Sequence, residues 1–291
     1  MKKTIITFLI CAGLYGCSSV PITGRSQLNL VSDQEVLALS LQEYNDYIKT
    51  AKVSKDKAAT DLVVKVGSKI AEAVRLYFQA TGMESLLEGY SWEFNLVDDP
   101  QANAFCMPGG KIVVYTGILP ICQDETGLAV VLGHEVGHAI AKHANERMSH
   151  QVILNGGAGV VGSLFNNSSE TVKAISSTVY GLGTQVGVML PFNRDQELEA
   201  DRMGLVLMAI AGYDVHAAVP FWQRMGASGG GTIEFLSTHP SDNRRVTEIQ
   251  KYIPEAMEYY DAIYGKGTQP PATNTNANPT KPASTNNEWR F

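Results

Sequence analysis

The chain has 291 residues, of which 44% are hydrophobic and 18% charged, and these proportions are ordinary for a globular protein. This length suits one sizeable domain or at most two small ones. The net charge of −6, with no clustered basic run beyond the start, gives no footprint for nucleic acid, so we expect no nucleic-acid partner. After residue 20 no apolar span is long enough to predict a transmembrane helix.

The first sixteen residues have the features of a secretion signal. Two lysines precede an apolar run that is too short to span a bilayer. A small residue then precedes Cys17, and this junction resembles the lipobox of bacterial lipoproteins, in which the chain is cut before the cysteine and the cysteine is acylated. We therefore predict a signal peptide over residues 1–16 and lipidation of Cys17. Residues 17–32 would form a lipidated tether to the membrane.

This resemblance implies a place in the bacterial cell envelope. The residue directly after Cys17 is not acidic, which favours the outer membrane, facing the periplasm, over the inner membrane. A plain signal peptide that is cut elsewhere is the alternative. In an exported protein Cys106 and Cys122 could form a disulfide, but the sequence does not place their Cα atoms within bonding range, so both states stay open.

Two amphipathic helices are expected after Ser32. In the second, apolar residues recur at helical spacing and form a stripe that packs on a core. The stripe consists of Leu62, Val66, Ile70, Val74 and Phe78. Gly82 ends this helix. Residues 90–96 alternate between apolar and polar side chains, which predicts a strand, and an Asp-Asp-Pro sequence breaks it.

A second strand is predicted over residues 111–115, after a Pro-Gly-Gly turn. From Asp124, a plausible N-cap, the pattern is helical to about His150. Residues 155–192 are rich in glycine and could form closely packed helices, a mobile lid or a membrane-facing patch. Another helix is expected from about Asp195 to Ala211, before Gly212.

The C-terminal part begins with a short helix near Asp214 and a last helix from about Ser241 towards Ile253. From Gly265 the chain is rich in Thr, Asn, Pro and Ala, so residues 265–291 are predicted to be a disordered tail. The sequence therefore predicts one α+β domain over residues 33–264. This domain is mainly helical and contains a small β-sheet.

The strongest functional signal is the sequence His134-Glu135-Val136-Gly137-His138. Helical residues four apart lie about 40° apart around the axis and about 6 Å along it, so both imidazoles can bind one ion. Neutral imidazole binds zinc, and Glu135 lies where it can take a proton from a bound water. A surface helix with two solvated histidines is the alternative. Apolar neighbours argue against it, because buried histidines need partners.

Zinc in a catalytic site needs a third protein ligand. His143 is unsuitable, because it lies about 140° around the helix from His138. Glu197 and Asp201 share one helical face, so Glu197 could bind the metal while Asp201 orients a ligand histidine. Glu199 points elsewhere. An acidic solvated helix face is the alternative, but the two-histidine motif favours a site with one Zn²⁺ per chain.

Together these motifs resemble the gluzincin metallopeptidases that include the HtpX heat-shock protease, the Oma-type mitochondrial protease and the type-one CAAX prenyl protease. Four segments carry the resemblance: Asn103-Ala104-Phe105 with Pro108-Gly109-Gly110, Gly133 to His138, Glu197 to Asp201, and Thr238-His239-Pro240 with Arg245. It spans about residues 33–255. Without clear transmembrane helices, the chain is most similar to the exported lipoprotein members.

The resemblance implies a zincin-like fold and a zinc-dependent metalloendopeptidase that hydrolyses peptide bonds of unfolded or misassembled proteins, in protein quality control. It also implies that an edge strand of the sheet borders the active-site cleft and holds an extended substrate. The residues assigned to this strand are Lys111, Ile112, Val113, Val114 and Tyr115. An ordinary place within the sheet is the alternative for them.

Three interpretations of His239 stay open. It could donate a hydrogen bond to the tetrahedral intermediate, rest on the zinc as a reversible plug, or form a structural His-Pro turn. Arg245 could pair with a site carboxylate or lie on a solvated helix face. Two rival functions also remain: a binding module or chaperone, against which the intact Glu135 argues, and a zinc hydrolase that acts on another bond. The sequence does not indicate an oligomeric state.

Overall fold

The computed structural model describes residues 17–154, 193–228, 235–236, 239 and 243–270. Three predictions fall outside these residues. They concern the signal peptide, the glycine-rich segment and most of the tail, which cover residues 1–16, 155–192 and 271–291.

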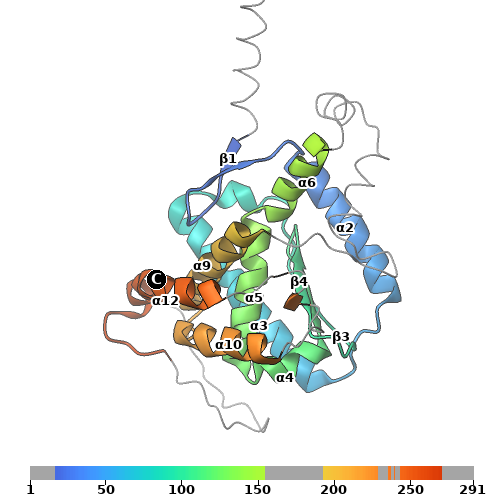
Figure 1. The fold of residues 1–291 in the computed structure, drawn as a ribbon. Helices are drawn as coiled ribbons and strands as arrows, with labels where there is room; N and C mark the ends of the chain where they lie inside the picture. The colour runs from blue at the N-terminus through green and yellow to red at the C-terminus, as the bar shows by residue number, and fades with distance from the viewer. Residues whose placement is uncertain (1–16, 155–192, 229–234, 237–238, 240–242, 271–291) are drawn as a thin grey trace, which may run out of the picture.

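A three-stranded sheet lies between two layers of helices (Figure 1). Its strands are β3 (Glu93–Val97), β4 (Ala104–Met107) and β5 (Lys111–Tyr115). The order is β3-β5-β4, with β5 parallel to β3 and antiparallel to β4. Four helices cover the two faces: α3 (Lys57–Thr81) and α5 (Glu125–Ile140) on one, α2 (Asp33–Thr50) and α6 (His143–Leu154) on the other. This arrangement confirms the predicted mainly helical α+β fold.

The prediction that Lys111–Tyr115 forms the edge strand is wrong. These residues form β5, the central strand, and all five of them are buried: Lys111, Ile112, Val113, Val114 and Tyr115. A strand that is covered on both faces is mostly apolar. Its composition therefore does not indicate whether it lies at the centre or at the edge of the sheet. Within the described residues β4 pairs with β5 alone and packs against α5, so β4 is the edge strand beside the predicted site.

The helix predicted from Asp124 to about His150 is divided into α5 and α6. Asp124 caps α5 by accepting a hydrogen bond from the Gly127 N–H at 2.8 Å. Between the two helices Lys142 has a φ of 56°, in the left-handed region. The apolar residues of α5 lie in the core above one face of the sheet, whereas those of α6 lie in the core on the other face. A straight helix could not bury both sets.

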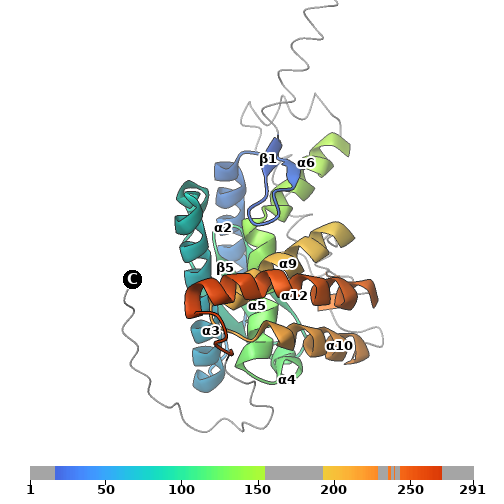
Figure 2. The same ribbon diagram turned by 90° about the vertical axis from the view of Figure 1, so that its left-hand side faces the viewer.

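Three further helices lie on the side of α5 away from the sheet (Figure 2). They are α9 (Arg194–Ile210), α10 (Ala218–Ser228) and α12 (Asn243–Tyr264). The first two contact α5, and α12 packs on these two. The last helix was expected to end near Ile253, but it continues past Pro254 to Tyr264. Proline removes one helical N–H, and tertiary contacts offset that loss. Tyr260 is buried, and the Tyr264 hydroxyl donates to the Ile210 carbonyl at 2.9 Å.

Helices α5 and α9 cross with their backbones in contact. A Cβ atom added to Gly204 would lie 2.9 Å from the carbonyl carbon of Gly133, and one added to Gly137 would lie 2.9 Å from the Ala200 carbonyl oxygen. Each helix therefore has a small residue at two positions four apart, where a larger one would separate the backbones. This crossing places the histidine motif of α5 opposite the acidic residues of α9.

Residues 17–28 form a hairpin that packs on the domain, although the sequence predicted an irregular tether from residue 17 to residue 32. Its strands are β1 (Cys17–Ser19) and β2 (Ser26–Leu28), which pair antiparallel. Val20 is buried in the main core, and the Ile22 N–H donates to the Tyr77 hydroxyl of α3 at 3.1 Å. Single contacts of this kind produce no periodic hydrophobic pattern in a polar segment, so periodicity could not predict the hairpin. Lipidation of Cys17 stays a prediction.

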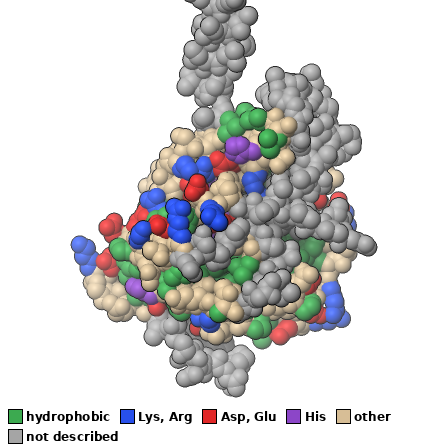
Figure 3. Space-filling model, viewed as in Figure 1, with side chains coloured by type: hydrophobic (Ala, Val, Ile, Leu, Met, Phe, Trp, Pro, Cys, Tyr) green, Lys and Arg blue, Asp and Glu red, His purple; other side chains and the backbone are tan. Residues whose placement is uncertain are grey.

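In the described part of the chain, no helix combines the length and the apolar character needed to cross a membrane. Acidic and basic side chains lie interspersed over the described surface that faces the viewer in Figure 3.

Candidate metal centre

Four buried side chains bring atoms that can bind a metal within 4.8 Å of one another: His134, His138, Glu197 and His239. The first two are on α5, Glu197 is in the first turn of α9, and His239 precedes α12. The Nε2 atoms of His134 and His138 are 3.1 Å apart. Glu197 places Oε2 3.4 Å from His134 Nε2 and Oε1 3.3 Å from His138 Nε2. The residues selected by helical spacing therefore lie together.

Glu135 lies beside this cluster and is 2% exposed. Its Oε1 atom makes no hydrogen bond and lies 3.4 Å from His239 Nε2. Burial raises the pKa of Glu135, because an apolar environment disfavours the charged form. The side chain can therefore hold a proton more readily than an exposed glutamate.

The donor set fits a divalent cation. Glu135 Oε1 and Glu197 Oε2 are buried carboxylate oxygens that make no hydrogen bond within the protein. Burial of carboxylate oxygens without a hydrogen bond is unfavourable, and a cation would compensate for it. Burial raises the pKa of Glu197, but His239, His134 and His138 outweigh this effect and hold the pKa well below its usual range. Imidazole nitrogens with one carboxylate oxygen are a common ligand set for transition metals.

Asp201 and Arg245 hold the imidazole ring of His134 in position. The His134 Nδ1–H donates to Asp201 Oδ1 at 2.9 Å. Arg245 donates to both carboxylate oxygens of Asp201, at 2.7 and 2.8 Å, and its Nη1 lies 3.2 Å from Glu197 Oε2. Arg245 is 1% exposed and its guanidinium lies 3.4 Å from the ring centre of Trp222. It therefore pairs with site carboxylates and does not lie on a solvated face.

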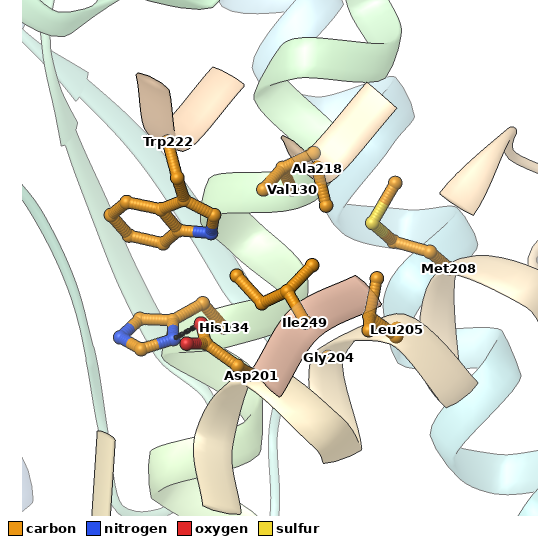
Figure 4. A pocket seen from close by; sticks show the side chains of 9 residues that line it. All are labelled: Val130, His134, Asp201, Gly204, Leu205, Met208, Ala218, Trp222 and Ile249. Carbon is orange, nitrogen blue, oxygen red and sulfur yellow. Dashed lines mark hydrogen bonds and ion pairs between the residues drawn. The ribbon is translucent and has the colours of Figure 1, made fainter. Parts of the chain in front are cut away.

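Apolar side chains enclose the bond between His134 and Asp201 (Figure 4). The ring of Trp222 lies over His134, Ile249 lies beside Asp201, and Val130 lies next to Ala218. The cavity that these residues line has a volume of about 10 Å³, roughly the space that one water molecule needs. Exclusion of bulk water strengthens the hydrogen bond and keeps the imidazole in one orientation.

A second set of polar residues supports His138. Its Nδ1 lies 2.7 Å from His143 Nδ1, and His143 Nε2 lies 2.9 Å from Glu199 Oε2. Glu199 in turn binds Arg25, with Nε at 2.8 Å. Helical spacing excluded His143 as a metal ligand and predicted that Glu199 points away from the site. The break at Lys142 turns His143 back towards His138, and periodicity gives no signal of that turn.

The edge strand β4 borders the cluster. The Tyr115 N–H donates to the Asn103 carbonyl at 3.0 Å, and antiparallel alternation then directs the backbone groups of Ala104 and Cys106 away from β5. The Asn103 side chain accepts from the Ala104 N–H at 2.9 Å. Burial and the nearby charge of Glu135 raise the pKa of the Cys106 thiol. Cys106 and Cys122 are both free thiols.

The family model described as Peptidase family M48 matches residues 68–253, more than half of the chain, so the chain belongs to that family. The "Mitochondrial metalloendopeptidase OMA1" of Schizosaccharomyces pombe is 32% identical over 255 residues, covering 82% of this chain and 67% of that protein. Its Saccharomyces cerevisiae counterpart is 31% identical, covering 83% and 70%. The "Beta-barrel assembly-enhancing protease" of Yersinia pestis is 30% identical, covering 55% and 34%. The predicted resemblance and the metalloendopeptidase activity class are thereby confirmed.

The predicted location, lipid-anchored in a bacterial cell envelope and facing the periplasm, is contradicted by these comparisons. The relatives that match about four fifths of the chain are named as mitochondrial enzymes. The prediction depended on a charged start and a short apolar run before Cys17. Those few residues are a narrow basis for a location, because targeting segments of different compartments share such features.

Proposed function

We propose that this member of peptidase family M48 is a zinc-dependent endopeptidase in which His134, His138 and Glu197 bind the metal. Glu135 is the general base. The observation that carries this proposal is the convergence of buried donors from α5 and α9 within 4.8 Å, next to a carboxylate oxygen without a hydrogen bond.

A bound Zn²⁺ supplies Lewis acidity, which makes water a nucleophile near neutral pH and polarises the peptide carbonyl. Glu135 takes the proton of the attacking water at a carboxylate oxygen and delivers it to the nitrogen of the departing amine. Burial helps the carboxyl to hold that proton between the two steps. Asp201 keeps a proton on His134 Nδ1, so the lone pair of His134 Nε2 faces the other donors.

His239 acts as a fourth donor in this conformation. Its Nδ1 lies 3.0 Å from Glu197 Oε1 and 3.2 Å from His134 Nε2, and its ring stacks on Phe235 at 4.5 Å. With a metal bound, the ring would compete with a substrate carbonyl for the cation. Substrate access requires the displacement of His239, which acts as a reversible plug.

Unfolded or misassembled protein chains bind along β4 as an added strand. The outward carbonyl of Ala104 and the outward N–H and carbonyl of Cys106 recognise any extended peptide, with little dependence on its side chains. The relative from Yersinia pestis is named for enhancing β-barrel assembly, which supports protein quality control as the role.

The test uses the full chain and its Glu135→Gln variant, with bound zinc and casein cleavage measured for both. We expect one zinc per chain in each protein and a loss of cleavage of at least ~10²-fold in the variant, because a positioned base contributes that much. The same measurements on His239→Ala reveal activity that the plug suppresses. Equal cleavage by the parent and Glu135→Gln, or a parent without zinc, would refute the proposal.

A further inference from the structure

We propose that His143, Glu199 and the turn at Thr23 and Arg25 are positioning residues that fix the orientation and tautomer of His138. The inference rests on the proposed role of His138 as a metal ligand. Residues 17–28, the N-terminal hairpin, would then belong to the metal centre although they are remote from it in sequence.

The hydrogen bonds between these groups permit one consistent arrangement of protons. A neutral His138 that binds a cation through Nε2 carries its proton on Nδ1. That proton is donated to His143 Nδ1 at 2.7 Å, so the proton of His143 is on Nε2. The Nε2–H then donates to Glu199 Oε2 at 2.9 Å, and the series ends on a carboxylate. Reversal of any one bond would place a proton on the His138 atom that faces the metal donors.

Arg25 and Thr23 hold this carboxylate in place. Arg25 contacts Glu199 Oε2 through Nε at 2.8 Å and Nη2 at 2.7 Å, and the Thr23 hydroxyl donates to Oε1. Hydrogen bonds from His143, Arg25 and Thr23 thus converge on the two oxygens of Glu199. Arg25 also donates to both oxygens of Glu146, at 2.8 and 2.9 Å, which joins α6 to α9.

The position of the turn does not depend on the metal centre. Val20 is buried in the main core, and the Ile22 N–H is bonded to Tyr77 on α3. The Leu30 N–H, just beyond the hairpin, donates to the Ser149 hydroxyl of α6 at 2.8 Å. The hairpin is therefore anchored on two helices, and the guanidinium of Arg25 reaches Glu199 from a fixed point.

The two histidines of the motif have parallel supports. Asp201 accepts the proton of His134 and is held by Arg245. Glu199 fulfils the same role for His138, with His143 inserted between them and Arg25 in the place of the second arginine. Both imidazoles therefore face the cation with a carboxylate behind them, a pattern that raises ligand basicity and limits rotation of the ring.

The test compares Glu199→Gln and Arg25→Ala with a matched control, Arg202→Ala. Arg202 lies on α9 as Glu199 does, and it contacts both oxygens of Glu255, at 2.7 and 2.8 Å, outside the site. Zinc affinity is measured by competition with a chelator. Because loss of such a supporting group weakens metal binding about 10- to 100-fold, we expect that loss in the two site variants. The control should remain within about twofold of the parent, since its ion pair touches no ligand.

Two further measurements separate positioning from folding. Urea unfolding of the metal-free proteins reports stability, and the visible absorption of the Co²⁺-loaded proteins reports ligand geometry. A changed spectrum in Glu199→Gln, which is nearly isosteric, supports the inference even where Arg25→Ala does not fold. Unchanged affinity, or a spectrum identical to that of the parent, would overturn it. A parent that binds no zinc would instead refute the proposed function together with this inference.

Discussion

Gly133 of α5 and Gly204 of α9 meet backbone to backbone, so that a Cβ atom on Gly204 would lie 2.9 Å from both the carbonyl carbon of Gly133 and the amide nitrogen of His134. The distance between the two helices is set by this contact. Because Glu197 and Asp201 lie on the same helix as Gly204, the contact also sets the distance between the carboxylates and the imidazoles.

Gly204→Ala should therefore separate the helices and weaken the site. We expect the variant to lose about 1–3 kcal/mol of stability through overpacking, and to bind zinc more weakly than the parent. Urea unfolding and chelator competition measure the two effects. Gly226→Ala on α10 is the control, because no atom lies within 4 Å of its added Cβ, and it should gain about 0.4–1 kcal/mol. Equal stability of Gly204→Ala and the parent would contradict the tight crossing.

Removal of zinc should stop cleavage and destabilise the fold together. Ligands that bind the folded state alone stabilise it by about 4 kcal/mol when free metal exceeds Kd about 1,000-fold. A chelator should thus lower the unfolding temperature of the parent and of Glu135→Gln alike, and added zinc should restore it. His134→Ala should unfold at the same temperature with and without chelator. A chelator-dependent shift in this variant would show that the metal binds elsewhere.

The backbone of β4 should contribute to substrate binding. Cys106→Pro removes the N–H that points away from β5, and proline is tolerated at such an edge position. Loss of one hydrogen bond to the substrate should lower kcat/KM about tenfold, mainly by raising KM. Cys106→Ala keeps the N–H and is the matched control. If both variants cleave casein with the same kcat/KM, substrate does not pair with this strand.

Glu125 should make stability depend on pH at the acidic end. Burial raises its pKa, but hydrogen bonds from Lys65 and Tyr213 and the charge of Lys69 outweigh this effect, and the net pKa is lowered from 4.5. A lowered pKa contributes stability above the unfolded value of 4.5 and loses it as the pH falls through the folded value. Glu125→Gln should cost about 1 kcal/mol at pH 7, and this difference should shrink below about pH 4.5. Urea unfolding at pH 7 and pH 3 measures it, and an equal difference at both values would contradict this account.

Local periodicity was sufficient for the features that lie within one element. The stripe on α3 and its end at Gly82, with φ 69°, follow from helical spacing and from the conformational freedom of glycine. The donors on α5 and α9 were selected in the same way, because positions four apart on a helix share a face. Contacts between elements could not be predicted so directly. Three features depend on how separate segments pack together. They are the edge position of β4, the contact of His143 with His138, and the contact of Arg25 with Glu199.

The two arginines that support His138 and His134 come from opposite ends of the described chain, Arg25 from the hairpin and Arg245 from the last helix. A polypeptide that lacks either the hairpin or the last helix therefore lacks one of the two supports.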